Sequence, residues 1–261
     1  MQKRHSDPQR YFNEQALSTQ KYIIPFIQSV KEINDSFQIL EIGCGEAGNL
    51  KPFLDLGCSC TGVDYSLSKI EKAIMNYSSF NYKNKLKLIS NDIYKTKEFH
   101  FQFDIIIIRD VIEHIHDQDK FLALIKDLIA LNGVVFFAFP PWQNPFGGHQ
   151  QMCKSKILSH LPFFHLLPKS IYRNVLRLFR EHKNTIIGLM EIKETGISLD
   201  KFERLILKNN YNILLKTLYL INPNYEVKFG LKPRILPSTF AKLPYLRNFV
   251  TTCGYFVINL K

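Results

Sequence analysis

The residues with the clearest chemical meaning lie in a glycine-rich segment at the end of a predicted strand. The segment reads Glu41-Ile-Gly43-Cys44-Gly45-Glu-Ala-Gly48, with the glycines spaced as G-x-G-x-x-G. Glycines in such a turn allow positive φ angles and a close approach of the backbone to a ligand, and the helix that follows offers free N–H groups. This spacing also permits a nicotinamide cofactor. The Glu41 carboxylate, however, favours a cationic amino-acid group over a pyrophosphate, because it can accept a hydrogen bond from the cation.

Three further segments follow in order. They are 61–66, which contains Asp64 and Tyr65; Asn91-Asp92-Ile93; and 103–114, which ends Arg109-Asp110-Val-Ile-Glu113-His114. Together with the glycine-rich segment, they resemble the class I S-adenosylmethionine-dependent methyltransferases, including the quinone-pathway O-methyltransferases. The resemblance covers residues 37–139 and, more loosely, residue 198 onwards. One departure is that Ala47 stands where the family usually has its third glycine, and Gly48 is displaced by one position.

The resemblance implies S-adenosyl-L-methionine as the cofactor and assigns residues to it. Asp64 would chelate the two ribose hydroxyls, Asn91 to Ile93 would contact the adenine, and residues 103–114 would border the methionine end. The complete set of expected cofactor-binding residues is Glu41, Gly43, Cys44, Gly45, Asp64, Tyr65, Asn91, Asp92, Ile93, Arg109 and Asp110. Cys44 is expected to be a small buried residue rather than a nucleophile.

Two polar groups could assist the transfer of a methyl group to a hydroxyl, which needs a base to remove the proton. His149 lies in the sequence Pro140-Pro-Trp-Gln-Asn-Pro-Phe-Gly-Gly-His-Gln-Gln, directly after the fifth predicted strand. It is the first candidate for general base or substrate contact, and a helix-capping role is the alternative. His114 is the second candidate. The resemblance suggests that Asp110, Glu113 and His114 could hold a divalent cation, but we expect a site without metal.

Amino-methylating enzymes of nucleic-acid bases provide an alternative interpretation. They place an Asp/Asn-Pro-Pro-aromatic tetrad after the fourth strand, where it stacks a flipped base. Here the fourth strand ends in Arg-Asp-Val-Ile, and the Pro-Pro-Trp sequence follows the fifth strand instead. The sequence therefore disfavours base flipping and leaves other RNA targets open.

Apolar runs alternate with helical patterns over the first half of the chain, which is typical of βαβ units and a parallel sheet. Strands are predicted at 37–42, 61–64, 85–90, 103–109, 133–139, 212–221 and 251–260, and helices at 50–56, 68–76, 119–131 and 198–210. One or two helices broken near Pro25 are expected over 11–33. The predicted fold is Rossmann-like α/β, a seven-stranded and mostly parallel sheet with helices on both faces. A helical insertion follows strand 5, and a long connection joins strands 6 and 7.

A single methyltransferase domain is predicted over residues 1–261. It has N-terminal helices in 1–35, a cofactor-binding half in 37–143 and a helical lid or substrate insertion in 144–196. Residues 197–261 form a C-terminal helix and strand pair with a basic loop at 222–250. The 261 residues are 46% hydrophobic and 22% charged, which excludes a disordered chain. The sequence has no signal-like start and an odd number of cysteines without a CxxC pair, which favours a reduced, cytoplasmic protein.

The net charge of +11 is concentrated in two segments. Residues 144–190 carry seven basic side chains and one acidic side chain, and residues 222–261 carry six and one, whereas residues 1–143 are nearly neutral. Both basic segments leave carboxyl ends of strands, where ligands bind in such sheets. We therefore expect them to meet above the cofactor and form a basic acceptor pocket. Within the first segment, 169–182 predicts an amphipathic basic helix, either a lid over the site or a contact with an anionic membrane surface.

These features predict a methyltransferase that O-methylates a small or lipid-linked anionic acceptor, such as a sugar of a surface glycan. An RNA methyltransferase and a non-catalytic membrane- or partner-binding protein of the same fold are the alternatives. Nucleic acid is the less expected partner. A cytoplasmic location is expected. The protein could also bind peripherally at the inner face of the membrane.

Overall fold

The computed structural model describes residues 8–82, 84–96, 99 and 102–261, so the first seven residues of the predicted N-terminal region lie outside the described part. Within these residues the strands form one sheet in the order β3-β2-β1-β4-β5-β8-β6-β7. The strands are β1 (Gln38–Ile42), β2 (Ser59–Asp64), β3 (Leu86–Ser90), β4 (Phe103–Arg109), β5 (Ile129–Phe139), β6 (Tyr211–Ile221), β7 (Arg234–Ile235) and β8 (Cys253–Leu260).

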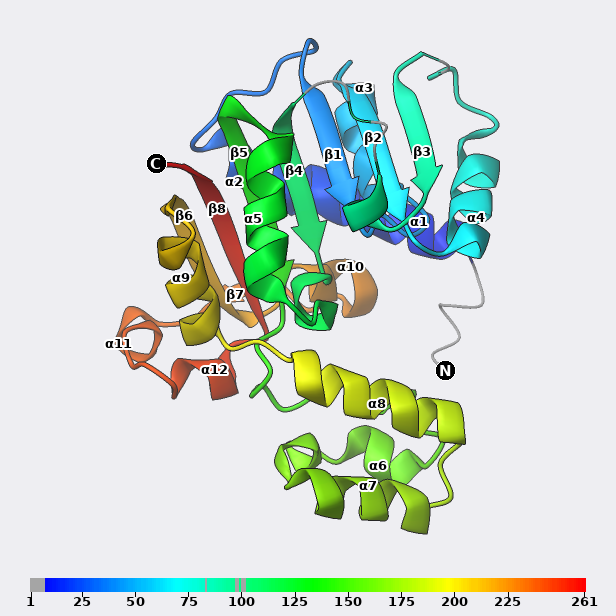
Figure 1. Cartoon of the computed structure of the whole chain (residues 1–261), viewed down its shortest axis with the longest axis vertical. Coiled ribbons are helices and arrows are strands. Elements are labelled where there is room, and N and C mark those ends of the chain that lie inside the picture. The colour runs from blue at the N-terminus through cyan, green and yellow to red at the C-terminus, as the bar shows by residue number, and fades with distance from the viewer. Residues whose placement is uncertain (1–7, 83, 97–98, 100–101) are drawn as a thin grey trace.

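The sheet is Rossmann-like and mostly parallel, as predicted. Strands β1 to β5 pair in parallel, and β8 is antiparallel to both β5 and β6. The described sheet has eight strands rather than the predicted seven, because two residues of the long connection after β6 pair antiparallel with it as β7. The carboxyl ends of β1 to β4 point to one edge of the sheet, where the helical insertion lies (Figure 1).

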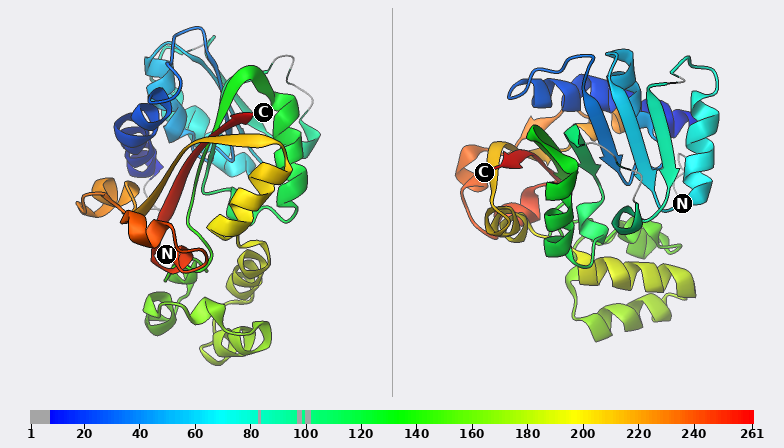
Figure 2. Two further views of the ribbon diagram at one scale, coloured as in Figure 1. Left: turned by 90° about the vertical axis from the view of Figure 1, so that its left-hand side faces the viewer. Right: turned by 45° about the horizontal axis from the view of Figure 1, so that its top comes forward.

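Helices cover both faces of this sheet (Figures 1 and 2). One face carries α5 (Gln118–Leu128) and α9 (Leu199–Lys208), which bury Phe121 and Phe202 against the central strands. The other face carries α1 (Pro8–Ser18), a π-helical turn (Thr19–Ile23), α2 (Ile24–Gln28), α3 (Lys51–Asp55) and α4 (Leu67–Tyr77). Ile105 to Ile108 of β4 are fully buried between the two layers, as four consecutive β-branched residues predict.

The sequence predicted a break in the N-terminal helices near Pro25, but the structure has none there. Pro25 lies in the first turn of α2, where its missing N–H group is tolerated, and the π-helical turn before it joins α1 to α2. Helical structure therefore continues from α1 into α2. Residue Phe12 of α1 lies against the glycine-rich loop, because a Cβ on Gly48 would lie 2.5 Å from the Phe12 carbonyl oxygen.

The boundary between α5 and β5 also differs from the prediction. The helix ends at Leu128, and Ile129 already pairs with Phe103 of β4. The register then shifts, so that Val134 pairs with Ile105, and residues 130–133 form an irregular stretch inside β5. The predicted helix 119–131 therefore ends early, at Leu128, because backbone pairing with β4 takes over before the apolar helical pattern ends.

Residues 144–196 form the insertion after β5. Its helices are α6 (Lys156–His160), α7 (Lys169–Leu178) and α8 (Lys183–Thr195), with 3₁₀ turns at Gln150–Met152 and Phe164–Leu166. The predicted basic helix 169–182 is shorter than expected, and Arg180 has a positive φ of 54°. Tyr172 and Leu176 of α7 are fully buried in a small core of the insertion itself, shared with Leu189 of α8. The central apolar residues of α7 thus pack on the insertion's own helices, while Ile171 and Leu178 remain exposed.

The connection after β6 contains α10 (Asn224–Phe229), α11 (Ser238–Ala241) and α12 (Arg247–Val250). It leaves the same sheet edge as the insertion, and the two segments meet where the Phe163 and Phe249 rings lie 6.3 Å apart. Ser198 caps α9 at the start of the predicted helix 198–210, because its Oγ accepts a hydrogen bond from the Lys201 N–H. Among the described residues, no helix has the length and apolarity needed to cross a bilayer.

Candidate active site

The glycine-rich loop leaves β1 at the carboxyl edge of the sheet and adopts the conformation that its glycines permit. Gly43 and Gly45 have φ angles of +71° and +56°. Ala47 also has a positive φ of +60°, a backbone conformation that residues other than glycine seldom adopt. The alanine in place of the family's third glycine thus keeps the left-handed backbone of this turn. Gly48, by contrast, serves the packing of α1.

Asp64 holds the loop from the neighbouring strand. Its side chain is 4% exposed, its Oδ2 accepts a hydrogen bond of 2.9 Å from the Gly45 N–H, and its Oδ1 accepts one of 2.9 Å from the Ser66 N–H. Lys69 Nζ lies 4.0 Å from Asp64 Oδ2. The adjacent Tyr65 is 82% exposed. The predicted ribose-binding carboxylate therefore lies directly beside the loop, with a lysine next to it.

Glu41 lies beneath the loop in a buried polar network. Its Oε1 accepts a hydrogen bond of 2.5 Å from Asn49 Nδ2, and among the described residues its buried Oε2 has no hydrogen-bond partner. Burial raises the pKa of Glu41 to about 8, against the lowering effects of the Asn49 hydrogen bond and the Arg109 charge. A cation that reached Oε2 would both satisfy this oxygen and favour the ionised form.

Arg109 belongs to the same network rather than to an open surface. Its Nη1 donates hydrogen bonds to Asn49 Oδ1 at 2.8 Å and to Ser18 Oγ at 2.9 Å, and Thr19 Oγ1 donates to the same Asn49 oxygen at 2.8 Å. The guanidinium therefore joins the N-terminal helix to the loop. Arg109 thus hydrogen-bonds Asn49 directly, and its charge acts on Glu41.

The remaining predicted cofactor residues lie along the same edge. Asp92 caps the 3₁₀ turn Ile93–Lys95, since its Oδ1 accepts a hydrogen bond of 3.0 Å from the Tyr94 N–H. Asn91 is partly buried, and its N–H donates to the Asp64 carbonyl oxygen at 3.1 Å. Cys44 is 1% exposed, and burial raises the pKa of its thiol well above the usual value, which fits a packing role.

Asp110 follows β4 with a positive φ of 54° and a side chain that is 55% exposed. Its N–H donates to the Ala138 carbonyl oxygen at 2.8 Å, which fixes the turn against β5. A polar cavity of about 20 Å³ lies beside it, with room for about one water molecule. The cavity is lined by Tyr11, Glu14, Gln15, Arg109, Asp110, Asn224 and Lys228.

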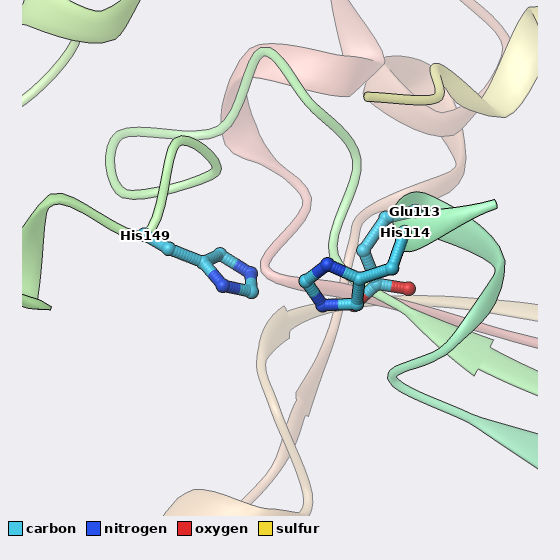
Figure 3. Close-up of side chains that lie close together, drawn as sticks. All are labelled: Glu113, His114 and His149. Carbon is cyan, nitrogen blue, oxygen red and sulfur yellow. The ribbon is translucent and has the colours of Figure 1, made fainter. Parts of the chain in front are cut away.

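The two predicted catalytic histidines lie next to each other although 34 residues separate them in the sequence. The His114 and His149 rings pack edge to face with centroids 5.1 Å apart (Figure 3). Burial lowers the pKa of His149 to about 4, and burial also lowers the pKa of His114. Both imidazoles are therefore neutral near pH 7, and each has a ring nitrogen that can accept a proton or a ligand.

The loop after β5 directs His149 into this position. A Cβ on Gly147 would overlap the Trp142 carbonyl oxygen, and one on Gly148 would overlap the His165 side chain, so only glycines fit this tight path. His149 itself has a positive φ of 54°. Gly147 and Gly148 therefore have a direct structural reason. His149 precedes the 3₁₀ turn Gln150–Met152, but its side chain makes no capping hydrogen bond there.

Glu113 completes this group, and the three residues fit a divalent cation. The ligand atoms of Glu113, His114 and His149 all lie within 4.8 Å of one another. Glu113 is 3% exposed, and neither carboxylate oxygen has a hydrogen-bond partner among the described residues. One carboxylate and two imidazoles are a donor set that suits zinc and related transition metals better than magnesium. The sequence suggested Asp110 as the third ligand, but His149 occupies that place in the group.

A sequence profile of the methyltransferase domain matches residues 13–166. The chain belongs to the class I S-adenosylmethionine-dependent methyltransferases. A ubiquinone biosynthesis O-methyltransferase from Pelagibacter ubique is 30% identical over 129 residues, 49% of this chain and 50% of that protein. Another from Brucella anthropi is 26% identical over 104 residues, 40% of this chain and 41% of that protein. The chain thus spans half or less of the length of these relatives.

Solved methyltransferase structures share the fold over almost the whole chain. The plantazolicin methyltransferase BamL, in complex with a triazolic desmethylPZN analog and SAH, has a TM-score of 0.58 at 11% identity, covering 98% of this chain and 86% of that one. Magnesium protoporphyrin IX methyltransferase from Synechocystis, with bound SAH, has a TM-score of 0.53 at 11% identity, covering 95% and 84%. The methyltransferase family and its cofactor, S-adenosylmethionine, therefore fit the glycine-rich loop described above.

Three contributors to this site had only weak signals in the sequence. Asn49 and Lys69 follow the loop and Asp64 at short range, but their contacts depend on how the following helices begin. Ser18 reaches Arg109 across 91 residues of sequence. No local pattern specifies such a contact, because it depends on how α1 lies across the sheet.

Proposed function

We propose that this methyltransferase transfers the methyl group of S-adenosylmethionine to an oxygen of a small or lipid-linked anionic acceptor. The cofactor lies over the Gly43–Gly45 turn, with its ribose hydroxyls at Asp64 and its ammonium group near Glu41. Such an assignment would explain why the fold keeps a buried carboxylate with an unpartnered oxygen beneath the loop. A sugar hydroxyl of a surface glycan is one acceptor of this kind.

The choice of an oxygen acceptor has two supports. The relatives described above are named O-methyltransferases of ubiquinone biosynthesis. In addition, the cofactor is already activated, so the protein must mainly position the hydroxyl and accept its proton. A neutral imidazole has a ring nitrogen that can accept that proton.

The observation that carries the proposal is the pairing of His114 and His149 at the same edge as the cofactor loop. The turn with His114 follows β4 and the loop with His149 follows β5, and these two strands are neighbours in the sheet. Lys69 connects the two parts of the site, because its Nζ lies 4.0 Å from Asp64 while its charge contributes to the lowered pKa of His114. We assign His149 as the general base, with His114 beside it orienting the acceptor.

The test is the rate of methyl transfer by the His149→Ala variant. We expect a loss of about 10²- to 10⁴-fold in kcat with an unchanged affinity for S-adenosylmethionine, because the histidine acts on the acceptor. Methyl transfer would be followed from labelled S-adenosylmethionine to a phenol, a catechol and a bacterial lipid extract. Cofactor affinity would be measured separately by calorimetry.

His116→Ala provides the matched control, because the His116 side chain is 63% exposed and contacts Glu191 instead of the pair. Its rate should equal that of the unchanged protein. If His149→Ala keeps the full rate, His149 has no role in the mechanism. If it loses cofactor binding along with the rate, its role is structural.

The unsatisfied carboxylate of Glu113 favours a second version of the same function. Glu113, His114 and His149 would then hold a divalent cation, which supplies Lewis-acid activation of the acceptor oxygen. The same assay distinguishes the two versions. Activity that survives exhaustive chelation supports the metal-free base, whereas activity lost on chelation and restored by Zn²⁺ or Mn²⁺ supports the cation.

A further inference from the structure

The short helices α11 and α12 expose an unusual concentration of apolar side chains. Six residues of this segment are at least 37% exposed, and we call them the α11–α12 surface: Phe240, Leu243, Tyr245, Leu246, Phe249 and Val250. The insertion extends this surface, because the exposed Phe163 ring lies 6.3 Å from that of Phe249. Isolated exposed apolar residues are ordinary, but a cluster of this kind marks an interaction site.

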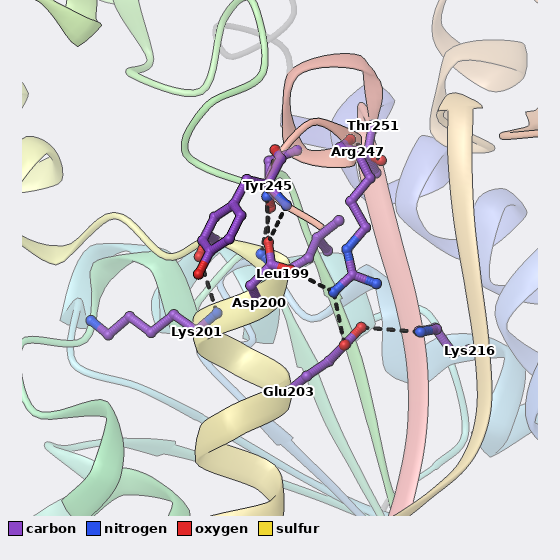
Figure 4. A network of polar contacts seen from close by, with 10 residues as sticks. Leu199, Asp200, Lys201, Glu203, Lys216, Tyr245, Arg247 and Thr251 are labelled. Atoms are coloured by element: carbon purple, nitrogen blue, oxygen red, sulfur yellow. Dashed lines mark hydrogen bonds and ion pairs between the residues drawn. The ribbon is translucent and has the colours of Figure 1, made fainter. Parts of the chain in front are cut away.

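The backbone beneath this surface is firmly anchored (Figure 4). Arg247 Nη2 donates hydrogen bonds to Asp200 Oδ1 at 2.9 Å and to Glu203 Oε2 at 2.8 Å, and Asn248 Nδ2 donates to Asp200 Oδ2 at 2.6 Å. Asn248 Oδ1 in turn accepts a hydrogen bond of 2.7 Å from the Leu199 N–H. The start of α9 thus fixes α12, and the apolar side chains project from an ordered support.

The exposed charges of this segment itself have one sign. No Asp or Glu occurs between residue 227 and the last residue, 261. Lys232, Arg234 and Lys242 are all exposed; Arg234 lies on β7, Lys232 precedes it, and Lys242 follows α11. Aromatic and aliphatic side chains next to basic residues are the combination with which proteins bind anionic lipid headgroups and the acyl boundary beneath them.

Two observations select a bilayer over the other occupants. A second copy of the chain would bring the same basic residues together across a two-fold interface, where like charges repel. A nucleic acid would contact the basic and aromatic side chains, but it has no apolar surface to cover Leu243, Leu246 and Val250. The basic helix α7, the sequence's own candidate for membrane contact, has its central apolar residues buried inside the insertion.

We propose that the α11–α12 surface docks this methyltransferase on an anionic phospholipid bilayer. The surface belongs to the connection that leaves β6 at the same sheet edge as the candidate active site. A protein docked in this way can receive a lipid-linked acceptor without extracting it from the membrane. The delivery of a lipid-linked acceptor rests on the proposed function, whereas docking on the bilayer does not depend on methyl transfer.

The test is co-sedimentation of the full chain with vesicles of phosphatidylcholine, with and without phosphatidylglycerol, in the absence of S-adenosylmethionine. We expect binding to the anionic vesicles that weakens as salt is added. The double variant Phe240→Ser with Leu246→Ser should bind at least tenfold more weakly, and Lys232→Gln with Lys242→Gln should lose most of the salt dependence. Melting temperatures equal to that of the unchanged protein would show that the variants fold.

Ile171→Ser with Leu178→Ser is the matched control, because both side chains are exposed on α7. It should bind as the unchanged protein does. The proposal is overturned if the unchanged protein ignores anionic vesicles, if the α7 variant loses as much binding as the α11–α12 variant, or if RNA binds with higher affinity than the vesicles. Concentration-dependent dimers that the Phe240/Leu246 variant abolishes would instead assign the surface to a second copy. Because no cofactor is present, a negative result here leaves the His149 experiment unaffected.

Discussion

Glu41 is a carboxylate that the fold buries without satisfying both oxygens. Its folded pKa of about 8 exceeds the ordinary value of 4.5 because of burial, so the folded protein retains a proton that the unfolded chain has already lost. The contribution of Glu41 to the stability of the folded state therefore falls as the pH rises from about 4.5 to about 8, and it does not fall further above that. A cationic ligand group beside Glu41 would offset this loss of stability.

Glu41→Gln tests this account at the scale of one residue. Glutamine keeps the acceptor for Asn49 and removes the charge, so the empty variant should melt above the unchanged protein, by a margin that grows between pH 5 and pH 8. Its affinity for S-adenosylmethionine should fall about tenfold or more, the contribution of one charge-assisted hydrogen bond. Thermal melts across pH and calorimetric titrations measure the two effects. A variant that is less stable and binds the cofactor normally would contradict the role given to Glu41.

At the scale of elements, α1 packs directly on the cofactor loop through Gly48. A Cβ at this position would lie 2.5 Å from the Phe12 carbonyl oxygen and 2.8 Å from the Gln15 Cβ, so the helix would have to move. Gly48→Ala should destabilise the protein by about 1–3 kcal/mol. Gly188→Ala is the control, because a Cβ there meets no atom within 4 Å and alanine is the better helix former. Chemical denaturation measures both, and equal stability of the two variants would contradict the packing described here.

The elements also show what could be predicted from the sequence. The strands of the cofactor half follow from apolar runs between turn residues, and the structure places them within a few residues of their expected positions. The end of α5 and the length of α7 could not be predicted in this way. Pairing of Ile129 with Phe103 is a contact between strands, and the burial of Tyr172 depends on α8, so neither is specified by the local pattern.

The same distinction applies to the candidate site. Glu41, Asp64 and His149 could be proposed from motif spacing, since strand ends of a parallel sheet meet at one edge. The pairing of His149 with His114 could not be proposed, because it depends on the path of the loop through Gly147 and Gly148. The polar network that holds Arg109 was equally inaccessible, since its partners come from the N-terminal helix.

At the scale of the whole molecule, the excess positive charge lies outside the neutral cofactor half. The sequence predicted that the two basic segments would meet above the cofactor. In the structure they touch through Phe163 and Phe249, and the segment after β6 also carries the basic and apolar residues of the α11–α12 surface. We therefore attribute part of the positive charge to the proposed membrane contact. On the insertion, Arg173, Arg177 and Lys183 line an open groove of about 820 Å³ together with Glu181, Glu191 and Glu194, so the charges of this groove balance.

The central claim is that this chain binds S-adenosylmethionine at the loop between β1 and α3, with Asp64 as the main anchor. Calorimetric titration of S-adenosylmethionine into the unchanged protein and into Asp64→Ala tests it most directly, with Asp55→Ala, an exposed carboxylate of α3, as the control. We predict one site in the unchanged protein and the control, and an affinity at least about a hundredfold lower in Asp64→Ala, because two charge-assisted hydrogen bonds are lost. Absence of binding to the unchanged protein, or equal affinity in Asp64→Ala, would contradict the claim.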